Sequence, residues 1–417
     1  MDSNYRLKKY KYKWIIFLIS PLLSIVFSFK NLRVKDTVNL VWAFVAFFGW
    51  SMVPYTDQKD SSAYRNKLQL LYNSEESQNN FLSNFYELGG ETDILIPLLI
   101  YLTSFITENG SVLFLLFGIV FGYFYSRNLG FILDITKNSH QHFLIVFLVF
   151  CLLLIIPFWS INGIRFWTAA HVVLWCVLSY CKHEKGKYYV LLFFTPLIHF
   201  SFIFVVLIFF VWKIFDPKNS TLLLILFFIS YFFSYYSISF VVELIQNYAP
   251  SFAENEVKSY THPDLIISTQ KGRVDSNWYV RYFLRALNLG VYILFYILIF
   301  RFGKKVFIDN QFLIKLTSFA LFFGVISNLF SVIPSFSRFT KITTFLFLFL
   351  CISFIINILN LNKKIPKITF VPIFLIFFWL VVNIRDGMDF ISLGTLSNPI
   401  IALVQELNDT ALINLIK

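Results

Sequence analysis

The chain is divided into about twelve strongly apolar runs separated by shorter polar connections. The runs are Trp14–Phe29, Thr37–Pro54, Ile94–Thr107, Ser111–Ser126, Phe143–Ser160, Phe166–Cys181, Tyr188–Trp212, Thr221–Tyr236, Ala286–Phe300, Phe312–Ile333, Thr340–Leu361 and Ile368–Ile384. A helix needs roughly 20 apolar residues to cross a bilayer, and some of the runs are shorter than that. The pattern therefore predicts roughly eleven or twelve membrane-embedded helices, some of them re-entrant.

Composition supports a membrane protein and argues against a soluble one. Hydrophobic residues make up 58% of the chain and charged residues 14%, and the mean hydropathy is +0.69. Such a chain has too little polar surface to cover a soluble globule. The four cysteines (Cys151, Cys176, Cys181 and Cys351) lie in or beside apolar runs, so no disulfide framework or metal-binding cluster is apparent. We expect an all-α polytopic membrane protein in which residues 1–417 form a single integral membrane domain.

Basic residues are concentrated in short connections between the runs, and their positions predict an orientation. These residues are Lys30, Arg33 and Lys35, Arg127 and Lys137, Lys182, Lys185 and Lys187, Lys213 and Lys218, Arg301, Lys304 and Lys305, and Lys363, Lys364 and Lys367. By the positive-inside rule, all of these connections belong to the cytoplasmic side. The basic N-terminal segment, residues 6–13, disagrees with this scheme, which places it outside.

The orientation requires two apolar runs to break inside the membrane. Ile94–Thr107 must enter and return on one side, and Tyr188–Trp212 must bend near Pro196 and His199. Both runs contain a proline, which removes a helical hydrogen bond and kinks the chain. The non-cytoplasmic face then carries the long loops 55–93 and 237–285, which we expect to be partly folded on the membrane surface.

Arg165 is the first candidate for chemistry, because it follows a short polar break between two long apolar runs. The break reads Asn162-Gly163-Ile164-Arg165, in which Asn162 offers an amide and Gly163 permits a tight turn. A guanidinium at helix-centre depth costs about 2.5–3.5 kcal/mol, and less near the surface. Either Arg165 snorkels to the interface, or it faces inward and pairs with an anionic ligand.

His199 is the second candidate, because it lies within an apolar run beside Pro196. Ionisable residues inside membranes often mark functional sites, and a neutral imidazole can accept a proton near physiological pH. The alternative is a histidine that is merely satisfied within the protein core.

Further cationic residues occur on the predicted outer side. Arg281 and Arg285 are four residues apart, which places them on one helical face, and Arg273 lies just upstream. Two like charges at this spacing are mildly destabilising, a cost that a shared phosphate would offset. Arg338 follows a Pro-Ser-Phe-Ser turn and opens the next run, as Arg165 does. Interfacial anchoring is the alternative for all of them.

The acidic candidates lie in the first outer loop. Asp57 and Asp60 precede Tyr64, and such carboxylates could act as a base or accept hydrogen bonds from sugar hydroxyls. Glu91 and Asp93 form an isolated acidic pair, which is only a weak indication of a divalent ion. The sequence contains no Gly-rich phosphate loop, serine nucleophile elbow or His-Glu-x-x-His motif. We expect neither a metal nor another cofactor.

Taken in order, these motifs resemble the EpsG-like branch of the bacterial Wzy-type polysaccharide polymerases. The resemblance rests on Asp57 or Asp60 with Tyr64, on Asn162 with Arg165, on Ile198-His199-Phe200-Ser201 and on Arg338 with Phe339, and it spans residues 37 to 360. The individual motifs are short, and their order is the distinctive feature. The first loop differs from the family's more compact Gly-x-Asp-x-x-Tyr pattern.

The resemblance implies a GT-C-like membrane glycosyltransferase that polymerises oligosaccharide repeat units carried on undecaprenyl pyrophosphate. It places the active site on the outer face of the bacterial inner membrane, implies a chain-length regulator and a flippase as partners, and implies no nucleic acid. The catalytic residues would be Arg165, His199, Asp57 and Asp60, and the substrate-binding residues Asn162, Arg338, Arg281, Arg285, Arg273, Tyr64, Trp278 and Tyr282. The arginines would hold the pyrophosphate, His199 or an aspartate would take the acceptor proton, and the aromatic rings would stack on sugars.

Two other functions remain open at this stage. A transporter or flippase of lipid-linked oligosaccharides also needs cations that face a cavity, although transporters often contain internal repeats and none is evident here. An O-antigen ligase or a polyprenyl-phosphate-sugar glycosyltransferase shares the chemistry and differs in its acceptor or carrier, so the sequence does not separate either of them from a polymerase.

Overall fold

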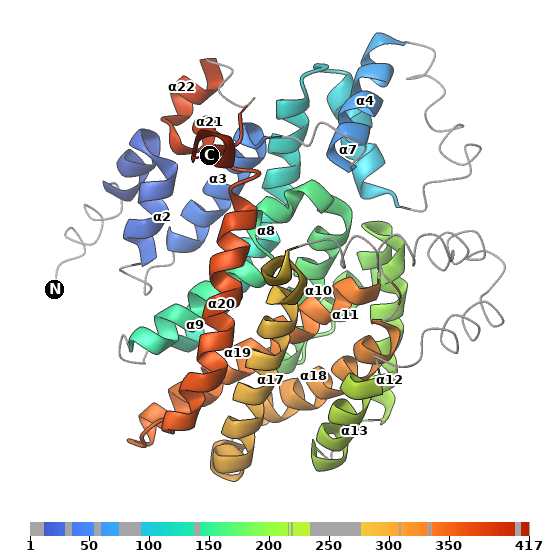
Figure 1. Cartoon of the computed structure of the whole chain (residues 1–417). Coiled ribbons are helices and arrows are strands. Elements are labelled where there is room, and N and C mark those ends of the chain that lie inside the picture. The colour runs from blue at the N-terminus through green and yellow to red at the C-terminus, as the bar shows by residue number, and fades with distance from the viewer. Residues whose placement is uncertain are drawn as a thin grey trace, which may run out of the picture. The chain divides into compact units, whose positions relative to one another are not determined.

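The protein is described by a computed structural model of residues 12–29, 36–53, 60–74, 93–136, 142–215, 217, 220–233, 277–307, 310–331, 333, 336–404 and 410–416 (Figure 1). Within these ranges the secondary structure is helical, apart from an isolated bridge between Ser392 and Ala411. Asp57, Arg273 and most of loop 237–285 lie outside the described residues.

Six helical segments are long and apolar enough to cross a membrane within the described part of the chain. They are Gly110–Thr136, Phe143–His183, Trp278–Gly303, Gln311–Phe330, Phe336–Asn360 and Lys367–Gly387. Four shorter apolar helices accompany them: Thr37–Ser51, Leu95–Ser104, Phe200–Phe215 and Thr221–Phe232. The prediction of an all-α polytopic membrane protein is therefore confirmed.

The helices sort into two compact units that are discontinuous in sequence. The first unit comprises Met1–Asn138, Ile156–Val206 and Ile384–Lys417, and the second comprises Ser139–Ile155 and Leu207–Asn383. The single membrane domain expected from the sequence stays a prediction.

The first unit contains most of the shorter helices. Its elements are α2 (Pro21–Phe29), α3 (Asp36–Ser51), α4 (Asp60–Asn73), α7 (Leu95–Ser104), α8 (Gly110–Thr136), η1 (Phe158–Gly163), α10 (Ile164–His183), α11 (Lys187–Phe193), η2 (Thr195–Leu197), η3 (Phe200–Phe202), α21 (Leu393–Leu396), α22 (Pro399–Val404) and α23 (Leu412–Ile416). Two further helices, α12 (Ile203–Phe215) and α20 (Phe370–Gly387), begin in one unit and end in the other.

Glycines allow α3 and α8 to pack with their backbones nearly touching. A Cβ atom placed on Gly118 would lie 2.6 Å from the carbonyl oxygen of Val45, and one on Gly49 would overlap the carbonyl of Phe114. The indole Nε1 of Trp42 donates to the carbonyl of Ile119 at 2.8 Å across the same interface. Small residues at such contacts are a common means of holding membrane helices together.

The C-terminal part of the first unit is bonded to the end of α3. The backbone N–H of Val53 donates to the carbonyl of Phe390 at 3.0 Å, and the Ser392 hydroxyl donates to the carbonyl of Ser51. Ser392 also forms a capping box with Thr395 at the start of α21. The backbone groups released where α3 ends are therefore satisfied by residues from the far end of the chain.

The second unit is built around α19 (Phe339–Asn360), and 89% of the most apolar stretch of this helical segment is buried. Its other elements are α9 (Phe143–Ile155), α13 (Ser220–Phe233), α17 (Trp278–Phe307), α18 (Gln311–Phe330), η5 (Phe336–Arg338) and η6 (Lys367–Thr369). Aromatic rings pack between these helices, with the centroids of Phe227 and Phe347 4.8 Å apart and those of Phe295 and Phe347 4.7 Å apart. Packing of aromatic side chains thus dominates this core.

The predicted break in Tyr188–Trp212 is present, whereas one predicted loop is helical. The segment is interrupted between α11 and α12 at η2, His199 and η3, as Pro196 suggested. Arg127, which the sequence analysis places in a connection, lies inside α8 because the following turns still bury apolar side chains such as Leu129 and Phe131. The Arg127 guanidinium lies 4.8 Å from the ring centroid of Tyr123 and donates to Asn39.

Candidate active site

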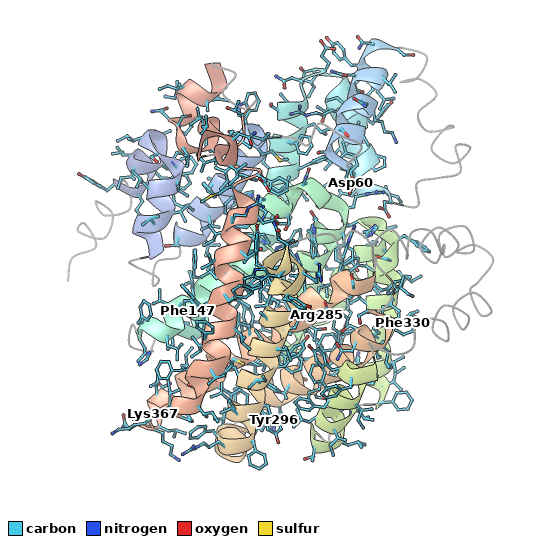
Figure 2. The ribbon with its side chains drawn as sticks, viewed as in Figure 1. Asp60, Phe147, Arg285, Tyr296, Phe330 and Lys367 are labelled. Carbon is cyan, nitrogen blue, oxygen red and sulfur yellow. The ribbon has the colours of Figure 1, made fainter. Side chains whose placement is uncertain are left out.

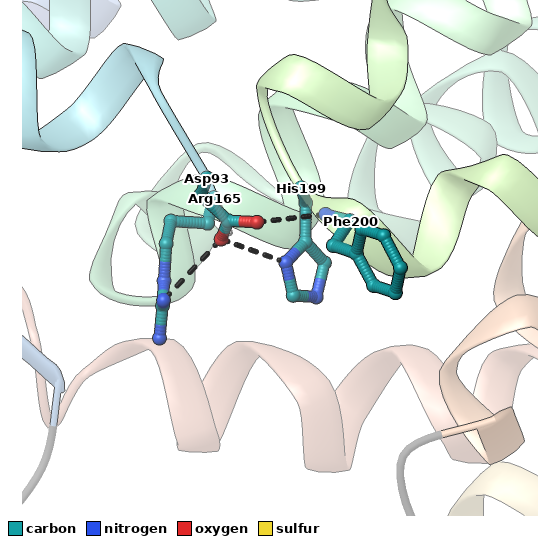
Figure 3. Close-up of polar contacts among 4 residues, drawn as sticks. All are labelled: Asp93, Arg165, His199 and Phe200. Carbon is teal, nitrogen blue, oxygen red and sulfur yellow. Dashed lines mark hydrogen bonds and ion pairs between the residues drawn. The ribbon is translucent and has the colours of Figure 1, made fainter. Parts of the chain in front are cut away.

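The carboxylate of Asp93 bonds to three separate groups in the first unit (Figure 3). Its Oδ2 lies 3.3 Å from Nη1 of Arg165 and 3.0 Å from Nδ1 of His199. Its Oδ1 accepts a hydrogen bond from the backbone N–H of Phe200 at 2.7 Å. We refer to Asp93, Arg165, His199 and Phe200 as the Asp93 cluster.

The Asp93 cluster combines a buried anion with two groups that remain accessible. The side chain of Asp93 is 3% exposed, whereas those of Arg165 and His199 are 34% and 13% exposed. A buried carboxylate requires pairing and hydrogen bonds to offset the loss of hydration, and Asp93 has both. Arg165 and His199 can therefore meet a ligand while Asp93 holds them in place.

The break in the helix explains how His199 reaches Asp93. His199 has extended backbone angles, φ −155° and ψ 118°, and the next residues begin η3 and α12. The carbonyl of Leu197 accepts from the N–H of Ile94 at 2.8 Å, and Asp93 accepts from Phe200. Non-helical backbone inside a membrane protein must find such partners, so the segment that starts α7 satisfies the break.

Arg165 reaches the cluster from the first turn of α10, which directly follows η1. A cation at a helix N-terminus opposes the helix dipole, and the carboxylate of Asp93 offsets this effect. Gly163 has φ −104° and ψ 52°, a negative φ that other residues also adopt. A Cβ there would lie 3.2 Å from the ring of Trp167. The Oδ1 of Asn162 is buried without a hydrogen-bond partner in the described structure.

Helix α4 brings Tyr64 and the charge of Asp60 to Arg165. The Arg165 guanidinium carbon lies 6.0 Å from the Tyr64 ring centroid, in the range of a cation–π contact. The Tyr64 hydroxyl is near enough for an electrostatic interaction but makes no hydrogen bond of good geometry within the described residues. Burial raises the pKa of Tyr64, and Arg165 offsets this only in part, so the phenol keeps its proton at neutral pH. Asp60 begins α4 and is exposed.

The arrangement suits His199 to proton transfer. When Nδ1–H donates to the ionised Asp93, the lone pair of the neutral ring lies on Nε2. Nε2 has no hydrogen-bond partner among the residues that the structure describes. The rings of Phe166 and Phe202 lie 5.6 Å and 6.2 Å from the imidazole by centroid distance and limit its other orientations.

The other predicted site residues that the structure describes lie in the second unit. Trp278, Arg281, Tyr282 and Arg285 occupy the first turns of α17, so the two arginines share a helical face as expected (Figure 2 labels Arg285). Trp278 stacks on Phe378 at a centroid distance of 5.8 Å, and the Arg285 guanidinium lies 5.7 Å from the ring of Tyr282. Arg338 ends η5 and is exposed. We refer to these residues as the second group. They belong to the second unit and the Asp93 cluster to the first, and a shared site stays a prediction.

Asp93 has partners in the structure that its sequence context does not identify. The sequence offered it only as half of an acidic pair with Glu91, and Glu91 lies outside the described residues. In the structure its partners are two cationic or basic side chains, 72 and 106 residues away. Its position just before a short, Pro97-containing apolar run was the available signal, because a carboxylate at such a point must be paired.

Comparison with known proteins identifies the family of the chain. Searches of curated proteins and of solved structures found no match to the chain. A family model described as the EpsG family matches residues 39–393, which takes in the whole Asp93 cluster and the α17 arginines. The match covers well over half of the chain, and the chain therefore belongs to the EpsG family.

Proposed function

We propose that this protein is a membrane glycosyltransferase that polymerises undecaprenyl-pyrophosphate-linked oligosaccharide repeat units into O-antigen or exopolysaccharide. Membership of the EpsG family supports a role as a polysaccharide polymerase. The observation that carries the proposed chemistry is the Asp93 cluster, in which one carboxylate holds both a base and a cation.

In the proposed reaction, an acceptor sugar hydroxyl attacks the anomeric carbon of the donor chain. The new glycosidic C–O bond forms as the bond from that carbon to the pyrophosphate oxygen breaks, and the electron pair leaves with undecaprenyl pyrophosphate. Nε2 of His199 takes the hydroxyl proton, and Asp93 stabilises the imidazolium that results. A positioned base of this kind contributes typically 10²–10⁴-fold to a rate.

Arg165 would bind the departing pyrophosphate. One of the five guanidinium N–H groups of Arg165 donates to Asp93. The Arg165 side chain is partly exposed, so its other N–H groups are available for phosphate oxygens. Positive charge aimed at a leaving group lowers the barrier more than it stabilises the bound substrate, because negative charge grows on that group. The protonated Tyr64 and the amide of Asn162 are suited to hydrogen-bond the donor beside it.

We assign the second group to binding the rest of the substrate. Arg281, Arg285 and Arg338, with Arg273 upstream, would engage phosphate or acidic sugars, and Trp278 and Tyr282 would stack on pyranose faces. Trp278 is 65% exposed and Tyr282 44%, so both rings have accessible surface. The site would face the periplasm or cell exterior of a bacterial inner membrane, beside a flippase and a chain-length regulator.

The test is polymerisation by purified protein in detergent, supplied with labelled undecaprenyl-pyrophosphate-linked repeat units. We expect a ladder of longer chains, which a transporter could not produce in a system without compartments. Arg165→Ala should lower the rate by about 10²–10³-fold, the usual loss when one group that stabilises transition-state charge is removed.

Arg301→Ala is the matched control, because Arg301 is an exposed arginine near the far end of α17. It should polymerise at the normal rate. Normal chain growth by Arg165→Ala, with an unchanged unfolding midpoint for both variants, would remove Arg165 from the reaction. If the wild-type protein makes no longer chains but transfers the donor glycan to a lipid A acceptor, the protein is a ligase instead.

A further inference from the structure

An apolar groove lies within the second unit. It has a volume of about 840 Å³ and is formed by the N-terminal turns of α9, the end of α19 with its following loop, and the first half of α20. Phe147 on α9 lines it, and Lys367 in the adjoining η6 marks the start of the α20 segment (Figure 2). Its size lies in the range of roughly 300–1,000 Å³ that is usual for small-ligand sites.

The groove opens onto the apolar outer surface of the unit. Two of its lining rings, Phe143 and Phe374, are 82% and 69% exposed. Large exposed apolar patches of this kind on a polytopic membrane protein face lipid. The expected content of the groove is therefore hydrocarbon.

One end of the groove is basic, in contrast to its walls. Lys363, Lys364 and His142 line it there, among residues that are otherwise almost all aliphatic or aromatic. Nδ1 of His142 accepts a hydrogen bond from the N–H of Leu144 at 3.3 Å, which leaves Nε2 as the N–H donor of the neutral ring. The groove thus offers two ammonium groups and an imidazole donor to a ligand that is apolar over most of its length.

The backbone fixes the two lysines at this end. Helix α19 ends in a Schellman-type turn, in which Asn362 has a left-handed φ of 53° and the N–H of Lys363 donates to the carbonyl of Ile358 at 3.1 Å. The hydroxyl of Thr369 then donates to the carbonyl of Pro366 at 2.7 Å at the start of α20. The loop between α19 and α20 therefore has a defined backbone conformation.

We propose that this groove binds an anionic phospholipid of the cytoplasmic leaflet. The phosphate would lie against Lys363, Lys364 and His142, and the acyl chains would occupy the apolar walls. Charge complementarity favours an anionic headgroup, and the positive-inside rule places this basic loop on the side where anionic lipids attract lysines. The assignment is independent of the polymerase reaction.

Photo-crosslinking in nanodiscs tests the proposal. The full-length protein is placed in phosphatidylcholine nanodiscs with a small fraction of phosphatidylglycerol that carries a diazirine in one acyl chain. A phosphatidylcholine probe with the same chain is the comparison. We expect the anionic probe to label the peptides around residues 143–147 and 363–377 on the order of tenfold more, given the attraction of each lysine near a membrane surface.

Two variants, each with a matched control, separate a site from general attraction. Lys363→Gln with Lys364→Gln should reduce labelling by the anionic probe to that of phosphatidylcholine. Lys185→Gln with Lys187→Gln should not, and these two exposed lysines lie at the start of α11 and just before it. Ile373→Trp, which fills the groove, should lower labelling by both probes. Val371→Trp adds the same ring at an exposed position outside the groove and should leave labelling unchanged.

Three results would overturn the proposal. The first is equal labelling of the wild-type protein by the two probes. The second is an equal loss of labelling by the anionic probe in the two double lysine variants. The third is displacement of the anionic probe by an equimolar amount of a polyprenyl phosphate. The last result would assign the groove to an isoprenoid lipid.

Discussion

Asp93 shows how a single residue can organise a site inside a membrane protein. Burying an unpaired carboxylate costs several kcal/mol, and Asp93 avoids this by accepting bonds from a guanidinium, an imidazole and a backbone N–H. Each of these bonds also constrains its donor. The carboxylate therefore orients His199 and Arg165 together, so its loss affects two functional groups at once.

We predict that Asp93 and His199 act as a unit in catalysis. His199→Gln removes the base, and Asp93→Asn removes the charge that orients and stabilises it, so each should lower kcat by about 10²–10⁴-fold. The double variant should be no slower than the slower single variant, because groups that act in one step are strongly non-additive. Rates of chain growth for the four proteins at saturating substrate provide the measurement.

Additive losses would contradict this prediction and indicate that Asp93 has a structural role only. Tyr64→Phe serves as the control at the same site, since it removes a hydroxyl without removing the ring beside Arg165. We expect it to raise KM more than it lowers kcat.

At the residue scale, the sequence could indicate Arg165 and His199 but not their common partner. Both stood out because ionisable groups within apolar runs are expensive. Asp93 lies beside a stretch that contains several acids, and its place just before the Pro97-containing run is a local signal that it must be paired. That signal does not identify the partners, because they lie 72 and 106 residues away and only the folded chain brings them together.

At the scale of elements, α3 and α8 depend on glycine for their close contact. We predict that Gly118→Ala destabilises the protein by about 1–3 kcal/mol, the usual cost of overpacking, because its Cβ would lie 2.6 Å from the Val45 carbonyl oxygen. Thermal unfolding in detergent gives the comparison. Gly186→Ala is the control, since nothing lies within 4 Å of a Cβ there and its effect should stay within about 0.5 kcal/mol. Equal unfolding midpoints for the two variants would show that α3 and α8 can move apart without loss of stability.

Helix boundaries followed from the sequence where proline or a polar break interrupts a run. The bend between α11 and α12 is such a case, because Pro196 and His199 both disturb a helix there. Arg127 does not end a span, although a cation after an apolar run suggests an end, because its side chain lies over aromatic rings and the helix continues for two more turns. A long cationic side chain can reach an interface from inside a helix.

At the scale of the whole molecule, the apolar pattern was enough to predict an all-α polytopic protein, since only helices and closed barrels span a bilayer. The division into two units was not predictable in the same way. Segments far apart in sequence, such as Ile156–Val206 and Ile384–Lys417, belong to one unit, and hydropathy carries no information about which helices pack together.

The proposed reaction leads to a prediction for the intact enzyme about metal ions. Pyrophosphate is already a good leaving group, and arginine can supply the positive charge that it needs. Chain growth should therefore continue at an unchanged rate in excess chelator, as gel analysis of the products will measure. Loss of activity that a divalent ion restores would contradict this and direct attention to Glu91 and Asp93.

The bonds between the end of α3 and residues 390–395 have a consequence for biosynthesis. Ser51 and Ser392 are 341 positions apart. The Ser392 hydroxyl that bonds to the Ser51 carbonyl is therefore synthesised roughly 20 to 70 s after Ser51. The Asp93 cluster is complete once His199 and Phe200 have been inserted, about half a chain earlier. The nascent protein can thus hold its reactive groups together while the bonds between the end of α3 and residues 390–395 have not yet formed, and this interval is when a membrane chaperone would be needed.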